Sequence, residues 1–287
     1  MAQSLPASAP GRGCNLCGGS GFAPLFEKDG FSILRCRGCG LVFTHPIPGE
    51  DSLRAIYGRD YFEGGLYRSY AGEAAARQAD YRKWLGWFTR ITGLSRGRWL
   101  DIGCATGSFM SAARDNGWEA RGLDLSGYCV GEAKGQGHDV RLGTARGLPP
   151  EWKDFDVISM WDTVEHLPDP SGDLAAAAAR LRPGGWFLAS TGDIASLAAR
   201  LLGRRWWLML PPVHLYFFSR PTLEGALRKA GLVPVAAKRF GRRLSLGRAA
   251  RLLGGARSTS LEGGPSLYFN AFDIMTLLAQ RPREARP

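Results

Sequence analysis

The chain has 287 residues, of which 45% are hydrophobic and 22% are charged. This composition excludes a disordered or collagen-like chain, and the length allows about two domains. No apolar run reaches the roughly 18 residues of a membrane-spanning helix. The N-terminus lacks the basic start and apolar core of a secretory signal. We therefore expect a cytoplasmic globular protein with a disordered lead-in at 1–11.

The net charge of the chain is +11, and the whole excess lies in its last third. Residues 1–200 hold 22 basic and 22 acidic side chains, whereas residues 201–287 hold 15 basic and 4 acidic ones. Such asymmetry indicates an anionic partner, but a solvated basic surface has the same composition. Both interpretations stay open at this stage.

Four of the six cysteines form two closely spaced pairs, Cys14-x2-Cys17 and Cys36-x2-Cys39. A gap of two residues lets both thiolates of one turn face a single ion, and glycine follows each pair, where such a turn needs a positive φ. The spacing predicts a zinc ribbon over 12–46, with Zn²⁺ held by these four cysteines and short strands at 31–35 and 41–44. Four thiolates leave no open coordination position, so we expect the metal to be structural.

A helical connector is expected over 47–95, after the prolines at 46 and 48. Its helix is predicted at about 72–92 and carries Trp84, Trp87 and Phe88. These aromatics would pack the connector onto the main domain, or line the mouth of a substrate site as a cap.

From residue 97 onward, apolar strands alternate with helices. Strands are predicted at 98–102, 119–123, 139–142, 155–161 and 186–190, with weaker ones at about 232–240 and 267–278; helices are predicted at 108–116, 128–135 and 173–181, the last ended by the Pro-Gly-Gly at 183–185. This alternation predicts an α/β fold over 96–287, with a Rossmann-like, seven-stranded, mostly parallel sheet and helices on both faces.

The first turn of this domain has the composition of a nucleotide-binding loop. Asp101, Gly103 and Gly107 join the first strand to its helix, and a second acid, Asp124, ends the next strand. A dinucleotide fingerprint would place glycine at residues 105 and 108, which are Ala105 and Ser108 here. A carboxylate at the loop repels phosphate but suits an ammonium and a sulfonium, and Asp124 can accept both ribose hydroxyls. The loop therefore favours S-adenosylmethionine (SAM) over NAD.

At this point the sequence resembles the class I SAM-dependent methyltransferases. The motifs that carry the resemblance cover about 97–192 and occur in the family's order: Asp101-x-Gly103-x-x-x-Gly107, Gly122-Leu-Asp124-Leu-Ser126, Phe155-Asp-Val-Ile158, Glu165-His-Leu-Pro-Asp-Pro170 and Leu181-Arg-Pro-Gly-Gly185.

The resemblance implies a role for each matching position. Gly103, Cys104, Ala105 and Gly107 would wrap the methionine part of SAM, Asp124 would hold the ribose, and Leu125 would lie against the adenine. Thr144 and Ala145 would border the adenine edge, where many relatives have an acid, and Trp161 and Asp162 would close over the cofactor. The ribbon head resembles that of sugar, secondary-metabolite and quinone-type methyltransferases. The chain is shorter than the sugar C-methyltransferases with a similar head, which carry an extra C-terminal domain, so the resemblance leaves the substrate open.

Methyl transfer from a sulfonium is an in-line displacement, which needs alignment and, for a weak nucleophile, a base. Histidine is the natural base near neutral pH, and the chain has four: His45, His138, His166 and His214. His138 is expected at the surface and His45 against the ribbon. His214 resembles the proposed base of zinc-headed sugar methyltransferases, although Val213 stands where those relatives have Glu. We interpret His214 and His166 as candidate catalytic residues; packing roles remain the alternative.

The favoured function is methyl transfer from SAM to O, N or C of a small-molecule acceptor, such as a nucleotide-sugar or secondary metabolite.

Residues 196–218 would form a lid, touch a membrane surface or simply pack on the sheet. The basic stretch 238–257 would hold the phosphate of a nucleotide-sugar, a carrier protein or lipid headgroups. The alternative is an RNA-modifying methyltransferase that uses the ribbon and basic tail, but the Asn/Asp-Pro-Pro-Tyr/Phe motif of nucleobase enzymes is absent after the fourth strand. A non-catalytic SAM-binding module and a reductase are less favoured, and the sequence does not indicate an oligomeric state.

Overall fold

The computed structural model describes residues 13–49, 74–245 and 266–283. The predicted lead-in at 1–11, the part of the connector at 50–73 and most of the basic stretch at 238–257 lie outside these ranges.

Seven strands of the described chain form one sheet in the order β10-β13-β8-β7-β4-β5-β6. Their bounds are β4 (Gly97–Ile102), β5 (Trp118–Asp124), β6 (Asp139–Leu142), β7 (Phe155–Trp161), β8 (Leu181–Gly192), β10 (Val233–Lys238) and β13 (Ile274–Gln280). Pairings from β6 to β8 are parallel, and β13 runs antiparallel to both of its neighbours. The predicted α/β fold with a mostly parallel seven-stranded sheet is confirmed.

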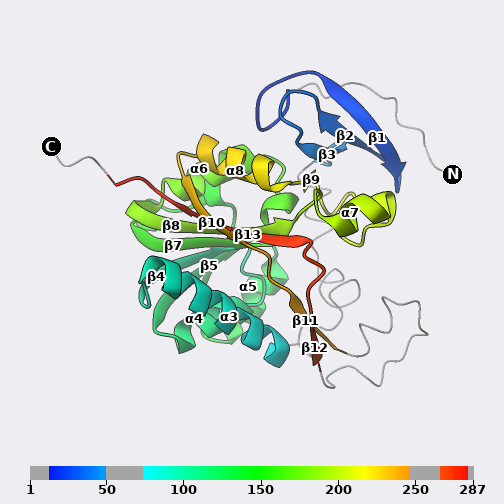
Figure 1. Cartoon of the computed structure of the whole chain (residues 1–287). Coiled ribbons are helices and arrows are strands. Elements are labelled where there is room, and N and C mark those ends of the chain that lie inside the picture. Colours follow the sequence, from blue (N-terminus) through cyan, green and yellow to red (C-terminus); the bar gives the residue numbers. More distant parts are fainter. Residues whose placement is uncertain (1–12, 50–73, 246–265, 284–287) are drawn as a thin grey trace.

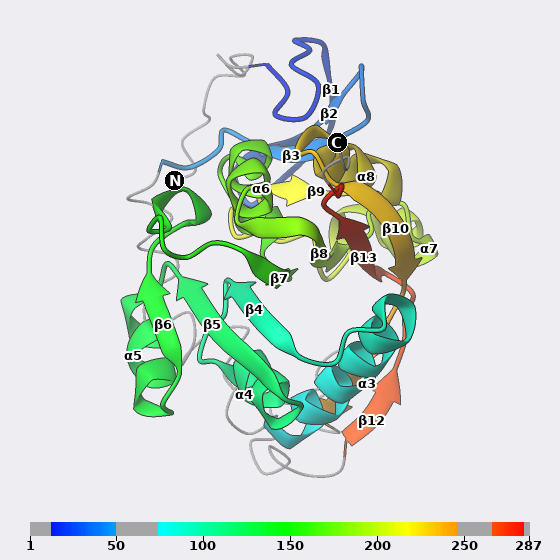
Figure 2. The same ribbon diagram turned by 90° about the vertical axis from the view of Figure 1, so that its left-hand side faces the viewer.

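Helices cover both faces of this sheet (Figures 1 and 2). One face carries α3 (Ala74–Thr92), α4 (Ser108–Asp115) and α5 (Gly127–Gly135), and the other carries α6 (Pro170–Ala178) and α8 (Arg220–Lys229). Because both faces are covered, the central strands are apolar runs rather than alternating ones. In β7, for example, Val157, Ile158 and Met160 are all fully buried.

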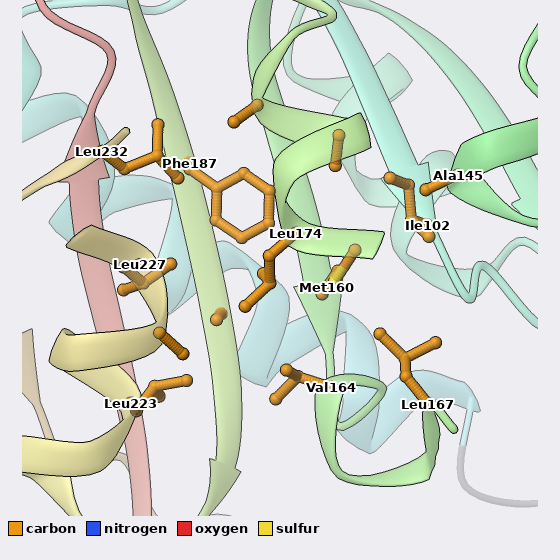
Figure 3. Packing of buried hydrophobic residues seen from close by; sticks show 14 of the residues in the cluster. Ile102, Ala145, Met160, Val164, Leu167, Leu174, Phe187, Leu223, Leu227 and Leu232 are labelled. Atoms are coloured by element: carbon orange, nitrogen blue, oxygen red, sulfur yellow. The ribbon is translucent and has the colours of Figure 1, made fainter. Parts of the chain in front are cut away.

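The two faces have separate apolar clusters. Figure 3 shows Leu174 of α6 and Leu223 and Leu227 of α8 around Phe187 of β8, in the larger cluster. On the opposite face, aromatic side chains of α3 pack on Trp99 and Trp118 of β4 and β5. Burial of one such side chain contributes about 1.5–3 kcal/mol, so α3 is held mainly by its aromatics. This agrees with the prediction that the connector helix packs onto the main domain.

The cysteine-rich segment forms a second sheet in the order β1-β2-β3-β9. Its bounds are β1 (Phe22–Lys28), β2 (Phe31–Cys36), β3 (Val42–His45) and β9 (Tyr216–Phe217). The expected strands at 31–35 and 41–44 correspond to β2 and β3, whereas β1 and β9 were not expected. Strand β9 comes from the main domain and pairs antiparallel with β3, so the ribbon is joined to the main domain by a shared sheet.

Three local expectations differ from the structure. Helix α6 ends at Ala178, and the Pro-Gly-Gly at 183–185 lies inside β8, which begins at Leu181 rather than at Trp186. The strand expected at 267–278 is two strands, because β12 (Ser266–Phe269) pairs with β11 (Arg242–Ser245) and β13 with β8. His138 is buried rather than at the surface, with Nε2 2.9 Å from Ser111 Oγ.

The segment after β8 contains the short helix α7 (Leu197–Leu202). Single 3₁₀ turns occur at η1 (Ala145–Gly147), η2 (Val164–His166) and η3 (Gly203–Arg205). Within the described ranges, we find no helix with the length and apolar character needed to cross a bilayer.

Candidate active site

The turn between β4 and α4 needs glycine at two positions. Gly103 and Gly107 have φ values of 76° and 84°, where L side chains are strained. A Cβ on Gly103 would lie 2.3 Å from Thr163 Oγ1, and one on Gly107 would lie 2.5 Å from His138 Cδ2. The loop can therefore pass close to both neighbours only because these residues lack side chains.

Asp124, at the end of β5, holds the same loop through its carboxylate. Its Oδ2 accepts a hydrogen bond from Ala105 N and its Oδ1 accepts one from Ser126 N, both at 2.8 Å. Each carboxylate oxygen has a second lone pair, so the group can also accept hydrogen bonds from two vicinal hydroxyls. Burial raises the pKa of Asp124, while the backbone N–H donors oppose that shift.

Asp101 is the more deeply buried acid, with 2% of its surface exposed. Burial raises the pKa of Asp101 to about 8, and the nearby charge of Asp124 adds to the shift. Ser159 Oγ donates to Asp101 Oδ1 at 2.6 Å and itself accepts from Trp99 Nε1 at 2.8 Å. A buried carboxyl that is neutral near pH 7 is prepared to ionise when a cation enters beside it.

The other residues that the sequence predicts at the cofactor lie at or after the ends of β5, β6 and β7. Leu125 follows β5 and is exposed, Thr144 precedes η1, and Ala145 is buried within it. Trp161 is the last residue of β7 and stacks on Trp84 of α3, with ring centroids 4.4 Å apart. Its ring is thus held against α3. Asp162 follows with a φ of 47°, and its Oδ1 accepts from Ser190 Oγ at 2.9 Å. The closing role expected for Trp161 and Asp162 stays a prediction.

His166 and His214 come from different loops and lie together. Their rings are edge to face, with centroids 4.8 Å apart. His166 Nδ1 is 2.8 Å from Val213 O, and His214 Nδ1 is 2.7 Å from Leu208 O. A carbonyl oxygen only accepts, so Nδ1 carries the proton in both rings and Nε2 carries the lone pair of the neutral form. Burial lowers the pKa of His166, which favours that neutral form.

Glu165 is the acid that the sequence interpretation missed. Its carboxylate and the ring nitrogens of His166 and His214 lie within 4.8 Å of one another, and Glu165 is 3% exposed. Val213 stands directly before His214 in the sequence, yet Glu165 of η2 brings a carboxylate beside His214. Leu215 N donates to Glu165 O at 2.8 Å, which joins the two loops. No local pattern in the sequence could have shown this pairing.

Two groups of described side chains could hold a metal ion. One is Glu165 with the two histidines. The other is Cys14, Cys17, Cys36 and Cys39, which the structure brings together as expected. Sγ of Cys14 is 3.5 Å from Sγ of Cys39, and Cys17 and Cys36 have the same separation. Thiolates around tetrahedral Zn²⁺ are about 3.8 Å apart, so four sulfurs at these distances fit such an ion. Gly18 and Gly40, directly after the pairs, have positive φ as predicted.

Comparison with known proteins gives matches over the main domain. A family of methyltransferase domains matches residues 75–237. Ubiquinone biosynthesis O-methyltransferase of Aromatoleum aromaticum is 34% identical over 114 residues, which is 37% of this chain and 49% of that protein. The protein of the same name from Bordetella avium is 30% identical over 164 residues, covering 52% and 68%. The chain thus spans about half the length of the first of these relatives.

A solved structure has the same fold. Magnesium protoporphyrin IX methyltransferase from Synechocystis PCC 6803, crystallised with bound SAH, superposes with a TM-score of 0.55 at 15% identity. The match covers 81% of this chain and all of that one. At this identity the likeness concerns the fold alone.

Proposed function

Because the chain belongs to the class I SAM-dependent methyltransferase family, we propose that it transfers the methyl group of SAM to a hydroxyl oxygen of a small-molecule acceptor. The observation that carries the choice of oxygen is the group formed by Glu165, His166 and His214. A hydroxyl is a weak nucleophile that must lose a proton on methylation, and a neutral imidazole next to a carboxylate is suited to take it.

The residues that would hold SAM are those around the β4–α4 turn. Asp101 would pair with the ammonium, Asp124 would accept both ribose hydroxyls, and the backbone at Gly103, Cys104, Ala105 and Gly107 would wrap the methionine part. Leu125, Thr144 and Ala145 would border the adenine, with Trp161 and Asp162 at the methyl end. When bound, SAM supplies an electrophilic methyl group on a good leaving group. Thr163, whose side chain lies against Gly103, joins this loop to η2 and therefore to His166.

The proposed proton acceptor is Nε2 of His214. As the acceptor oxygen bonds to the methyl carbon and the carbon–sulfur bond breaks, the hydroxyl proton passes to His214 Nε2. The hydrogen bond from Nδ1 to Leu208 O fixes the tautomer that this role needs. The carboxylate of Glu165 would stabilise the imidazolium, which then releases its proton to solvent. His166 would orient the acceptor and help to fix the position of His214.

We also propose that Cys14, Cys17, Cys36 and Cys39 hold a structural Zn²⁺. The support is the separation of the four sulfurs and the positive φ of Gly18 and Gly40. Metal analysis of the purified chain should give about one zinc per chain, and Cys36→Ala should lose it.

The acceptor is a small molecule rather than RNA in this proposal. The relatives and the solved structure reported above are named as O-methyltransferases of ubiquinone biosynthesis and as a magnesium protoporphyrin IX methyltransferase. They give no support to the RNA alternative. The names do not transfer a particular acceptor to this chain, so phenols, sugars and other hydroxyl compounds all belong in the screen.

The test is a screen of hydroxyl acceptors with labelled SAM, followed by His214→Ala and His166→Ala on the best acceptor. We expect His214→Ala to lower kcat about 100-fold or more, to leave SAM affinity within twofold, and to regain part of its turnover with added imidazole. Near-normal turnover of His214→Ala would remove the base assignment. If a chelator that leaves the ribbon zinc in place abolishes turnover, a metal at Glu165, His166 and His214 replaces the base.

A further inference from the structure

The cysteine-rich ribbon contacts the backbone of His214 directly. Thr44 in β3 is fully buried, and its Oγ1 donates to His214 O at 2.8 Å. Its backbone N–H donates to Leu215 O, also at 2.8 Å. The next two residues, Tyr216 and Phe217, form β9 and pair with β3 as part of the ribbon's own sheet. The ribbon therefore supplies the hydrogen-bond donors for two successive carbonyl groups, those of His214 and Leu215.

A second contact joins the ribbon to the loop that carries His166. Asn15 lies between Cys14 and Cys17, and its Nδ2 donates to Asp169 Oδ1 at 2.7 Å. Asn15 Oδ1 accepts from Ser171 N at 2.9 Å, and its backbone carbonyl accepts from Ser171 Oγ at 2.7 Å. Asp169 is the N-cap of α6 and follows His166 by three residues. The cysteine turn thus fixes the far end of the η2 segment.

The two histidine loops are also bonded to each other. His166 Nδ1 donates to Val213 O, Leu215 N donates to Glu165 O, and Tyr216 Oη donates to Pro168 O at 3.2 Å. Each loop is therefore joined to the other and to the ribbon. Figures 1 and 2 show β9 beside β3, where the cysteine-rich head meets the main domain.

We propose that the ribbon is a clamp that sets the position of His214, and that Thr44 is a positioning residue for methyl transfer. In its effect on turnover, this inference rests on the function proposed above. The route from metal to histidine is short. Cys39 lies three residues before β3 begins at Val42, and Cys36 N donates to Leu41 O at 2.8 Å, so the cysteine turn leads directly into the strand that carries Thr44. Release of the metal would loosen the start of β3 and, through it, the backbone of His214.

The first test compares Thr44→Val with Thr44→Ser in the full-length chain. Valine keeps the shape but cannot donate to His214 O, whereas serine can. We measure SAM affinity, kcat and KM, and the rate at which diethylpyrocarbonate modifies each histidine, read by mass spectrometry, with His138 as internal reference.

For Thr44→Val we expect a fall in kcat of about 10- to 100-fold, because small misplacements of a reacting group carry such costs. We expect SAM affinity within twofold, at least threefold faster modification of His214, and an unchanged rate at His138. Thr44→Ser should restore all of these values. Unchanged modification of His214 and unchanged kcat in Thr44→Val would overturn the clamp.

The second test removes the ribbon metal with a chelator and repeats the modification assay. Faster modification of His214, reversed by added Zn²⁺, supports the clamp without any reference to turnover; an unchanged rate contradicts it. Asn15→Ala provides a second variant in case Thr44→Val does not fold, with His166 as the expected site of change. The two proposals can fail separately. If only the base assignment is wrong, His214→Ala has normal turnover, while Thr44→Val still makes His214 react faster with diethylpyrocarbonate.

Discussion

Ser159 donates a hydrogen bond from Oγ to Asp101 Oδ1 over 2.6 Å, linking the middle of β7 to the acid at the start of the β4–α4 loop. It is a single neutral donor to a carboxyl that is otherwise enclosed. The hydrogen bond lowers the pKa of Asp101, but burial outweighs it, and the pKa stands at about 8. Asp101 is therefore mostly protonated at neutral pH.

This pKa predicts that SAM and SAH bind more tightly as pH rises from 6 to 8. Pairing with the ligand's ammonium requires the carboxylate, so binding below the pKa must release a proton, and the observed affinity rises by up to about tenfold per pH unit. Calorimetry in two buffers of different ionisation enthalpy should detect close to one proton released at pH 7. Asp101→Asn should bind weakly with no pH slope; a flat profile for the unmodified chain would contradict the assignment.

Asp124 is expected to contribute both to the ligand and to the loop. Asp124→Ala removes the acceptor of Ala105 N and Ser126 N, and with it the expected ribose contact. We expect SAH affinity to fall about 100-fold, because hydrogen bonds to a charged group contribute about 1.5–3 kcal/mol each. The SAH affinity of Asp124→Asn should lie between that of the unmodified chain and that of Asp124→Ala. The control is Asp139→Asn, an exposed acid on β6 paired with Arg121, which should leave SAH affinity unchanged.

Gly103→Ala should abolish SAM binding and lower stability. The new methyl group would meet Thr163 at 2.3 Å on a backbone with φ of 76°, a conformation that costs about 1–3 kcal/mol for a non-glycine residue. Gly131→Ala is the matched control. It lies within α5 with nothing within 4 Å of the new Cβ, so it should stabilise by about 0.5–1 kcal/mol. Thermal melts with and without SAH measure both effects; equal shifts for the two variants would contradict this account of the loop.

Arg239→Met should destabilise the chain through Asp193. Asp193 is fully buried after β8, and its Oδ2 pairs with Arg239 Nη2 at 2.5 Å. Removing the cation leaves a buried carboxylate without its ion-pair partner. Because Arg239 itself is partly exposed, we expect the free energy of unfolding to fall by about 2 kcal/mol, less than the roughly 3–5 kcal/mol for a fully buried pair. Denaturant unfolding measures it. Arg220→Met, in an exposed pair with Glu224 one helical turn away, should cost less than about 0.5 kcal/mol.

Features that depend on local sequence were predicted well. The period of apolar residues located the central strands, and the Cys-x2-Cys pairs located a four-cysteine group, because each signal lies within a few residues. The glycines at 103 and 107 were predicted for the same reason: a tight turn demands them wherever the rest of the chain lies.

Features that depend on long-range contacts were missed. Strand β9 has two residues and no periodicity, and it exists because β3, more than 170 residues earlier, supplies its partner. Glu165 lies beside His214 only because two loops far apart in the sequence pack together. The residue directly before His214 is Val213, so the local sequence gives no sign of a neighbouring carboxylate. The early start of β8 follows from its pairing with β7, where Phe155 lies opposite Leu181 in spite of the Pro-Gly-Gly that follows.

The two-residue strand β9 also limits how this protein can be rebuilt. The sheet of the N-terminal head is completed by β9 of the main domain. If the head is exchanged for that of another protein, the removed β3 has an unpaired edge, and the stretch around Tyr216 in the main domain loses its partner strand. A functional chimera would have to carry both partners of that edge together. Any insertion or deletion between Pro211 and Ser219 would be transmitted to the head, although that segment lies far from it in sequence.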